Sequence, residues 1–348
     1  TMFASALKHA AGVDLYRRPF WANHGHWRRW CWPPYAEWMG FGDHTERWKQ
    51  TWESNANLVE TIRRETGDEM LAGYVEQFRA EAEGLDTRED RRMSALDAKL
   101  YLLEATEQTE ANAPRQELEN TALRTFPGAG WAAVRTHIDD PEHDVAFIFR
   151  SSPYGSYSHS HANNNDFIIH VAGKVMAMPS GYYDGYGSAH HTHWNWHTKS
   201  HNCVTLSDAS QLMRSRDSVG AIEHAFEDDL VAYMMGNADA SYLQADRCRR
   251  HVLYIKPHAC FFLVDEFVAV PGVYSALQWN IHSWNQFDHD ADARVFTVNR
   301  GASSLSGHIM HHQNGVFSLT EGWDPPPADT KPSDQWFMQY HLRYMPVG

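Results

Sequence analysis

The sequence predicts an α+β protein of more than one domain, helical in its first third and built of antiparallel strands after that. Three observations predict this class. Apolar residues recur at helical spacing up to about residue 110, and short strand-like segments follow one another from Gly130 onward. The length of 348 residues is also sufficient for one large or two ordinary domains with buried cores.

Helices are expected where one face of a segment is apolar. The segments are 44–52, 54–68, 68–82 and 88–106. Asp43 is placed to cap the first, in which Trp48 and Trp52 are four residues apart and share a face. Gly67 is placed to end the second. The short connections between these segments fit antiparallel helix pairs.

Strands are expected in eight segments rich in β-branched and aromatic residues. They are 130–138, 144–152, 166–178, 202–208, 230–236, 249–255, 259–270 and 274–283. Ala172, Gly173 and Lys174 are expected to form a hairpin turn inside the third. So many strands without helical spacing between them favour an antiparallel sandwich. The polar stretch 106–120 marks the boundary between a helical domain, 1–110, and a β-domain, 111–348.

Composition excludes some classes of partner. The formal charge of −14 argues against nucleic acid, since phosphate binding needs a basic face. The sequence has no run of about 18 apolar residues, so it predicts no membrane span. The first residues lack the pattern of a signal peptide, although a mature secreted chain or an excised fragment would look the same. A periplasmic or secreted location, with the cytoplasm as the alternative, therefore stays open.

Seven of the 14 tryptophans lie before residue 53, in a stretch that also carries arginine and histidine. Flat rings suit the faces of sugars, and arginine suits a carboxylate. The stretch therefore makes Trp21, Arg28 and Arg29 candidate substrate-binding residues. The alternative is a helix-packing cluster whose arginines are simply solvated.

Eight of the 23 histidines fall between His159 and His201. His159 and His161 are two residues apart, so on a strand they point to the same side, as metal ligands or as part of a polar site. His170 lies in an apolar strand and is interpreted as a core residue.

The loop of about 20 residues before His201 is too long and aromatic for a mere connector, and long ordered loops often carry function. Its candidate substrate-binding residues are Tyr182, His190, His191 and Trp194. These histidines could instead bond the loop to itself or bind a metal structurally. Zinc takes three or four N, O or S ligands, and His161 could meet His201 if the loop returns beside the strand. The sequence contains no local motif that fixes such a site.

Three segments, SSPYGSYSHSHANNNDFIIHVAGKVMAMPSGYY, GSAHHTHW and TKSHNCVTLSD, resemble the heparinase II/III-like polysaccharide lyases, and most of all their oligoalginate lyase branch. The segments FASALKHAAGVDLYRRP, FPGAGWAAVRT and RRHVLYIKPHACFFLVDEF are similar to landmarks of the same family, in the same order. The resemblance implies a partial (α/α) toroid followed by a large antiparallel β-sandwich.

The resemblance also implies a reaction, the β-elimination of a uronic-acid polymer, which needs no cofactor. A base removes the C5 proton, the C4–O bond breaks, and an unsaturated uronate is left. Because a proton α to a carboxylate is weakly acidic, donors must neutralise that carboxylate first. His159 matches the family's catalytic histidine. His161 and His201 match its first and last metal ligands, which implies a structural zinc.

Two departures from the family pattern qualify this reading. Pro179 stands where the heparinase branch has an aspartate ligand, which weakens the zinc prediction and favours alginate over a glycosaminoglycan as substrate. The family's catalytic tyrosine lies upstream of the landmark with which this chain begins. We therefore expect a C-terminal portion of a lyase, inactive on its own if a separate part supplies the tyrosine.

The alternatives are a non-catalytic carbohydrate-binding remnant of such a lyase and, with less support, a metal-dependent hydrolase. In either lyase-related reading the partner is an anionic polysaccharide or oligosaccharide. The arginine-tryptophan stretch and the histidine loop are expected to face one cleft. The sequence leaves open whether the protein forms a homodimer.

Overall fold

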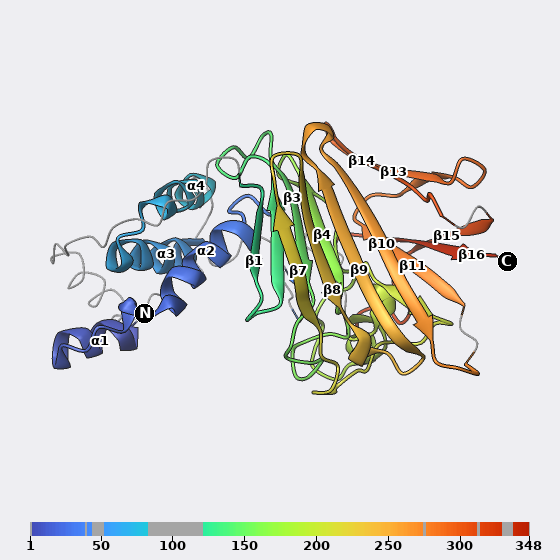
Figure 1. Cartoon of the computed structure of the whole chain (residues 1–348), viewed down its shortest axis with the longest axis horizontal. Coiled ribbons are helices and arrows are strands. Elements are labelled where there is room, and N and C mark those ends of the chain that lie inside the picture. Colours follow the sequence, from blue (N-terminus) through green and yellow to red (C-terminus); the bar gives the residue numbers. More distant parts are fainter. Residues whose placement is uncertain are drawn as a thin grey trace. The chain divides into compact units, whose positions relative to one another are not determined.

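The computed structural model (Figure 1) describes residues 2–38, 40–43, 52–82, 121–273, 276–311, 314–328 and 337–347. The chain divides into two compact units. The first consists of Thr1–Ala36 and Trp48–Glu119, and the second of Glu37–Arg47 and Asn120–Gly348. The short segment that contains Asp43 therefore belongs with the strands, although it lies among helices in the sequence.

The described part of the first unit is helical. Its helices are α1 (Met2–Ala11), α2 (Pro19–Cys31), α3 (Trp52–Thr66) and α4 (Ala72–Ala82). The last two confirm the helices predicted over 54–68 and 68–82. Gly67 follows α3 with a φ of +69°, the left-handed conformation that ends a helix and that glycine adopts at little cost. The helix predicted over 88–106, the boundary at 106–120 and all but Trp52 of the helix over 44–52 lie outside the described residues.

Helices α3 and α4 bury one apolar cluster between them. It consists of Ala56, Val59, Ile62, Leu71, Tyr74, Val75 and Phe78. Helix α2 packs closely against this cluster at Gly25. A Cβ added there would lie only 2.6 Å from Leu71 Cδ1, so a larger residue would not fit without a shift. No helix among the described residues is long and apolar enough to cross a membrane.

The described part of the second unit contains four antiparallel sheets. In order across the first sheet, the strands are β1 (Leu123–Phe126), β2 (Trp131–Arg135), β3 (Val145–Arg150), β4 (Asp166–Val171) and β5 (Lys174–Ala177). The second sheet has β10 (Cys260–Ala269), β9 (Ala245–Ile255), β8 (Val231–Asn237) and β7 (Ala221–Glu227). The third has β15 (Gly315–Glu321), β16 (Tyr340–Pro346), β11 (Leu277–Ser283) and β6 (Val204–Leu206). The fourth has β12 (Asp288–Asp290), β13 (Val295–Arg300) and β14 (Ser303–His308).

Every predicted strand segment contains a strand, and the predicted hairpin is present between β4 and β5. Its two central residues, Ala172 and Gly173, have φ values of +47° and +76°, as a tight hairpin of matching twist requires. Strands β1, β7 and β12 to β16 were not predicted from the sequence, and β7 illustrates the reason. Most of its side chains are exposed, so it has no alternation of apolar and polar residues to signal a strand.

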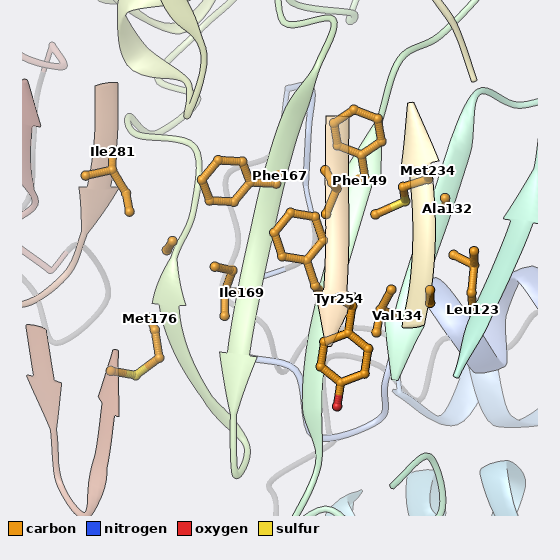
Figure 2. Packing of buried hydrophobic residues seen from close by; sticks show 14 of the residues in the cluster. Leu123, Ala132, Val134, Phe149, Phe167, Ile169, Met176, Met234, Tyr254 and Ile281 are labelled. Carbon is orange, nitrogen blue, oxygen red and sulfur yellow. The ribbon is translucent and has the colours of Figure 1, made fainter. Parts of the chain in front are cut away.

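The core of the second unit lies between sheets (Figure 2). Phe149 and Phe167 of the first sheet pack in one cluster with Met234 and Tyr254 of the second and Ile281 of the third. Because each sheet buries one apolar face against the others, the strand ends and long loops are left to carry polar side chains.

The predicted fold class, a partial (α/α) toroid followed by one large β-sandwich, is wrong. The described residues are mainly β, with 36% strand and 23% helix, and their strands are divided among four small sheets. The reason is physical. Amphipathic spacing shows which face of a helix is buried but not how many helix pairs surround it, and strand patterns do not show where one sheet ends and the next begins.

Buried histidines make the stability of the fold depend on pH. Burial lowers the pKa of His170 and of His341 to about 3, and that of His282 well below its usual value. The folded protein therefore holds these rings neutral, whereas the unfolded chain protonates them near pH 6.5. Unfolding therefore takes up protons between about pH 3 and 6.5. The contribution of these rings to the free energy of unfolding is highest above this pH range and decreases as the pH falls through it.

We expect the free energy of unfolding in urea to fall between pH 6.5 and 4 by about 1.4 kcal/mol per pH unit for each such histidine. His341→Gln should reduce the slope, and the same change at the exposed His258 should not. A free energy of unfolding that stays constant between pH 7 and 5 would contradict this explanation.

Candidate functional site

Asp43 is held beside the histidine-rich segment by backbone contacts within the second unit. Gly42 bridges to Ser160 in antiparallel fashion, and the Asp43 N–H donates to the His159 carbonyl at 3.0 Å. A Cβ on Gly42 would lie 2.4 Å from the same carbonyl oxygen, so this close approach needs glycine. The position of the Asp43 carboxylate is therefore set by the chain itself.

The Asp43 carboxylate contacts three imidazoles. Its Oδ2 lies 2.8 Å from His159 Nδ1, and its Oδ1 lies 2.8 Å from His161 Nε2 and 2.7 Å from His191 Nε2. An ionised carboxylate can only accept hydrogen bonds, so each of these ring nitrogens donates a proton.

A contact other than that with Asp43 fixes which ring nitrogen of His191 carries the proton. The backbone N–H of Gly187 donates to His191 Nδ1 at 2.8 Å, so this nitrogen carries the lone pair and Nε2 carries the proton. His191 begins a short π-helical turn, His191–Asn195, and is fully buried. A rigid, buried donor thus points at Asp43 Oδ1.

The three hydrogen bonds determine the charge at the centre of the site. Burial opposes ionisation of Asp43, but the hydrogen bonds from His161, His191 and His159 outweigh it and hold the pKa of Asp43 well below its usual range. Burial lowers the pKa of His161 to about 3, against the hydrogen bond to Asp43, which raises it. At neutral pH the site therefore has one ionised carboxylate and a neutral His161.

His159 differs from the other two histidines because it reaches solvent. Its side chain is 68% exposed, whereas those of His161 and His191 are 6% and 0% exposed. Since Nδ1 donates to Asp43, the neutral ring has its lone pair on Nε2. A carboxylate that orients an exposed imidazole in this way leaves Nε2 able to accept a proton from a bound molecule.

The predicted pair His161 and His201 is brought together, with ring centroids 5.2 Å apart. His201 is nevertheless engaged at both nitrogens. Nδ1 lies 2.8 Å from Asp166 Oδ2, and Nε2 lies 3.1 Å from the Asn195 carbonyl. His201 therefore joins the buried network beneath the site and has no nitrogen left for a metal ion.

Another group of donor atoms could hold a metal, namely those of Asp43, His161 and His191, which lie within 4.8 Å of one another. Zinc binds a ring nitrogen through its lone pair, but His191 Nε2 keeps its proton as long as Gly187 occupies Nδ1. Pro179, which lines the small cavity next to His161, has no side-chain donor. As they are hydrogen-bonded, these residues do not fit the zinc ion that the sequence predicts.

The other loop residues predicted to bind substrate are buried. The Tyr182 hydroxyl donates to the Phe337 carbonyl at 3.0 Å, and His190 Nδ1 donates to the Pro325 carbonyl at 2.6 Å. The Trp194 indole N–H donates to Ser180 Oγ at 3.2 Å. These bonds fix the loop that carries His191, and this burial gives no support to direct contact with a substrate.

Trp21, Arg28 and Arg29 belong to the first unit. Trp21 packs against the cluster between α3 and α4, and Arg29 is buried. The Arg28 guanidinium lies 4.5 Å from the Trp32 ring centroid, and its Nε donates to His24 Nε2 at 3.3 Å. Their predicted position in one cleft with the histidine loop stays a prediction.

Sequence reasoning missed the two carboxylates of the site. Asp43 precedes His159 by 116 residues, and its sequence context suggested only a helix cap. Asp166, which accepts from His201, directly follows three asparagines behind the His159 and His161 pair. The short distance in sequence between Asp166 and the pair His159 and His161 could have identified Asp166 as a site residue. The sequence around Asp43 contains no comparable signal.

Comparisons with known proteins identify relatives of this architecture. A sequence model described as "Heparinase II/III-like, C-terminal" matches residues 119–345. A search of curated proteins finds no match. Among solved structures, a heparinase III aligns with a TM-score of 0.55 and 14% identity, covering 99% of this chain and 57% of that one.

The heparan sulfate lyase HepC from Pedobacter heparinus aligns with a TM-score of 0.52 and 13% identity, covering 85% of this chain and 48% of that one. At such identities the likeness shows the fold alone. The chain spans about half the length of these solved relatives.

Asp43→Asn should change the tautomer of His159. His161 and His191 both donate to Oδ1, so the new amide oxygen must take that position. Its NH2 group then faces His159 Nδ1, which must accept and passes its proton to Nε2. We expect the ¹⁵N chemical shifts of His159, assigned with His159→Gln, to exchange between the Nδ1–H and Nε2–H patterns.

His143 provides an internal reference, because it contacts Asp140 in the same way, with Nδ1 2.8 Å from Oδ2. Its pattern should not change in the Asp43→Asn protein. If His159 kept its Nδ1 proton in this variant, the carboxylate could not be what fixes the ring.

Proposed function

Because the chain belongs to the heparinase II/III-like family, we propose that it serves as a polysaccharide lyase that cleaves a uronic-acid polymer by β-elimination. The observation that carries this proposal is the pair of Asp43 and His159, a buried ionised carboxylate that holds an exposed imidazole at 2.8 Å. Such a pair supplies a base of fixed orientation at the protein surface.

The pair matches what the chemistry needs. His159 Nε2 takes the C5 proton of the uronate, and the C–H electrons form the C4–C5 double bond. The C4–O bond breaks, and its oxygen takes up a proton from water or a nearby hydroxyl. Asp43 stabilises the imidazolium that forms, because it already accepts the hydrogen bond from Nδ1. No step needs a metal ion.

A glycosaminoglycan of the heparan sulfate type is the first choice of substrate, and alginate is the second. The aligned solved structures carry the names heparinase III and heparan sulfate lyase. The alginate preference rested on Pro179 and on motif resemblance, and the comparisons do not support it. The other predicted partner, a second copy of the chain, stays a prediction, as does a periplasmic or secreted location.

The test is cleavage of heparan sulfate and of alginate, followed by the ultraviolet absorbance of the new double bond. We expect turnover of heparan sulfate, and His159→Ala should lower kcat by about 10² or more, the scale for loss of an acid–base group. The control is His143→Ala, which removes an exposed histidine that also contacts an aspartate.

Wild-type turnover by a folded His159→Ala protein would refute the assigned role of His159. Binding of either polymer without cleavage would favour the carbohydrate-binding alternative.

A further inference from the structure

Two arginines near the site are exposed and have no acidic partner. Among the described residues, no carboxylate lies within ion-pair distance of Arg214 or Arg216. Arg135, Arg250 and Arg343, by contrast, each contact an aspartate at 2.6 or 2.7 Å. Both unpaired guanidinium groups lie on one loop between β6 and β7. In a chain with a formal charge of −14, they are available for an anion from outside.

Backbone contacts hold this loop against the turn that leads to His159. The Ser156 N–H donates to the Ser215 carbonyl at 2.9 Å, and Ser156 Oγ donates to the Leu212 carbonyl. A Cβ on Gly155 would lie 2.5 Å from the Ser215 carbonyl oxygen, so the two segments approach as closely as backbone allows. The position of the arginines relative to His159 is therefore built into the fold.

Each guanidinium also stacks on an aromatic ring. Arg214 lies 4.0 Å from the centroid of Trp196, and Arg216 lies 5.1 Å from that of Tyr157. Arg214 has a φ of +54°, a conformation that costs free energy in a residue other than glycine and that is often found at functional sites. Stacking fixes the plane of a guanidinium. Arg214 Nη2 donates one hydrogen bond, to Thr192 Oγ1 at 3.2 Å, and the other N–H groups of the two arginines are left for a planar anion.

These rings connect the arginines to His159. Tyr157 precedes His159 by two residues. The Trp196 ring lies 5.3 Å from that of Tyr186, which in turn lies 5.9 Å from the His159 ring. Tyr157 and Tyr186 are 54% and 61% exposed, so both offer a flat apolar face beside the exposed imidazole.

We infer that Arg214 and Arg216, with Tyr157 and Tyr186, form a subsite for an acidic saccharide unit next to the one that His159 acts on. The guanidinium groups bind its carboxylate or sulfate, and the tyrosine rings contact the sugar faces. This inference rests on the proposed function and adds the residues that select an acidic chain. Unpaired cations are needed there because the net charge of the protein repels a polyanion at long range.

The experiment measures binding rather than turnover. Calorimetric titration uses a heparan sulfate hexasaccharide, the same hexasaccharide with its sulfates removed, and a neutral chitin hexasaccharide. The variants are Arg214→Ala/Arg216→Ala, the corresponding double lysine variant, and Arg294→Ala. Arg294 is a matched control because it also has a left-handed backbone, with φ +56°, but lies between β12 and β13.

We expect the wild type to bind the acidic saccharides more tightly than the neutral one. The double alanine variant should bind them about tenfold more weakly and with a shallower salt dependence. The lysine variant keeps the charge but loses the planar fork, so its affinity should be intermediate. Arg294→Ala should bind like the wild type. If the double alanine variant loses affinity only for the sulfated hexasaccharide, the arginines bind the sulfate groups. If it loses affinity equally for both acidic hexasaccharides, the arginines bind the carboxylate.

The outcomes separate this inference from the proposed function. Acidic saccharides bound equally by the wild type and by a double alanine variant of unchanged Tm would overturn the subsite and leave the lyase proposal standing. Arginine-dependent binding without cleavage would support the subsite alone. A wild type that prefers no acidic saccharide over the neutral one would overturn both.

Discussion

The described part of the site depends on one buried carboxylate, that of Asp43, and on its need for hydrogen-bond donors. A charge removed from water must be compensated by well-placed donors, or the group becomes protonated instead. Here three imidazoles supply them from two segments of the chain, at 2.7–2.8 Å. The hydrogen bonds that keep Asp43 ionised also hold the histidine loop against the turn that carries His159. The charge of the carboxylate and the position of the His159 ring therefore depend on the same contacts.

A second polar layer supports the first. Asp166 accepts from His201 Nδ1 and from the Asn202 N–H. The buried guanidinium of Arg250 donates to the carbonyls of Asn165 and Asn202 and pairs with Asp265. Because these groups satisfy one another, the segments on both sides of the site are fixed by hydrogen bonds. Rigidity of this kind is what a base of fixed orientation needs.

The sequence was informative where a signal is local. Strands β2 to β6 could be predicted from their β-branched and aromatic residues, and the turn at Ala172 and Gly173 from its glycine. The approach of His161 to His201 could be predicted if the loop between them folds back beside the strand. The position of Asp43 could not be predicted, because a contact across more than a hundred residues has no periodicity. The predicted toroid was wrong because the apolar pattern of a helix does not specify which other helices it packs against. Arg214 and Arg216 were missed because they differ from the paired arginines in lacking an acidic partner among the described residues, and the sequence does not show ion pairs.

The most direct test of the central claim is a neutron crystal structure of the wild-type chain at neutral pH, in which protons are located. The account predicts protons on His159 Nδ1, His161 Nε2 and His191 Nε2, each directed at Asp43, and none on the carboxylate. His191 Nδ1 should be bare and face the Gly187 N–H. A protonated Asp43, or a metal ion bound between these side chains in place of the protons, would contradict it.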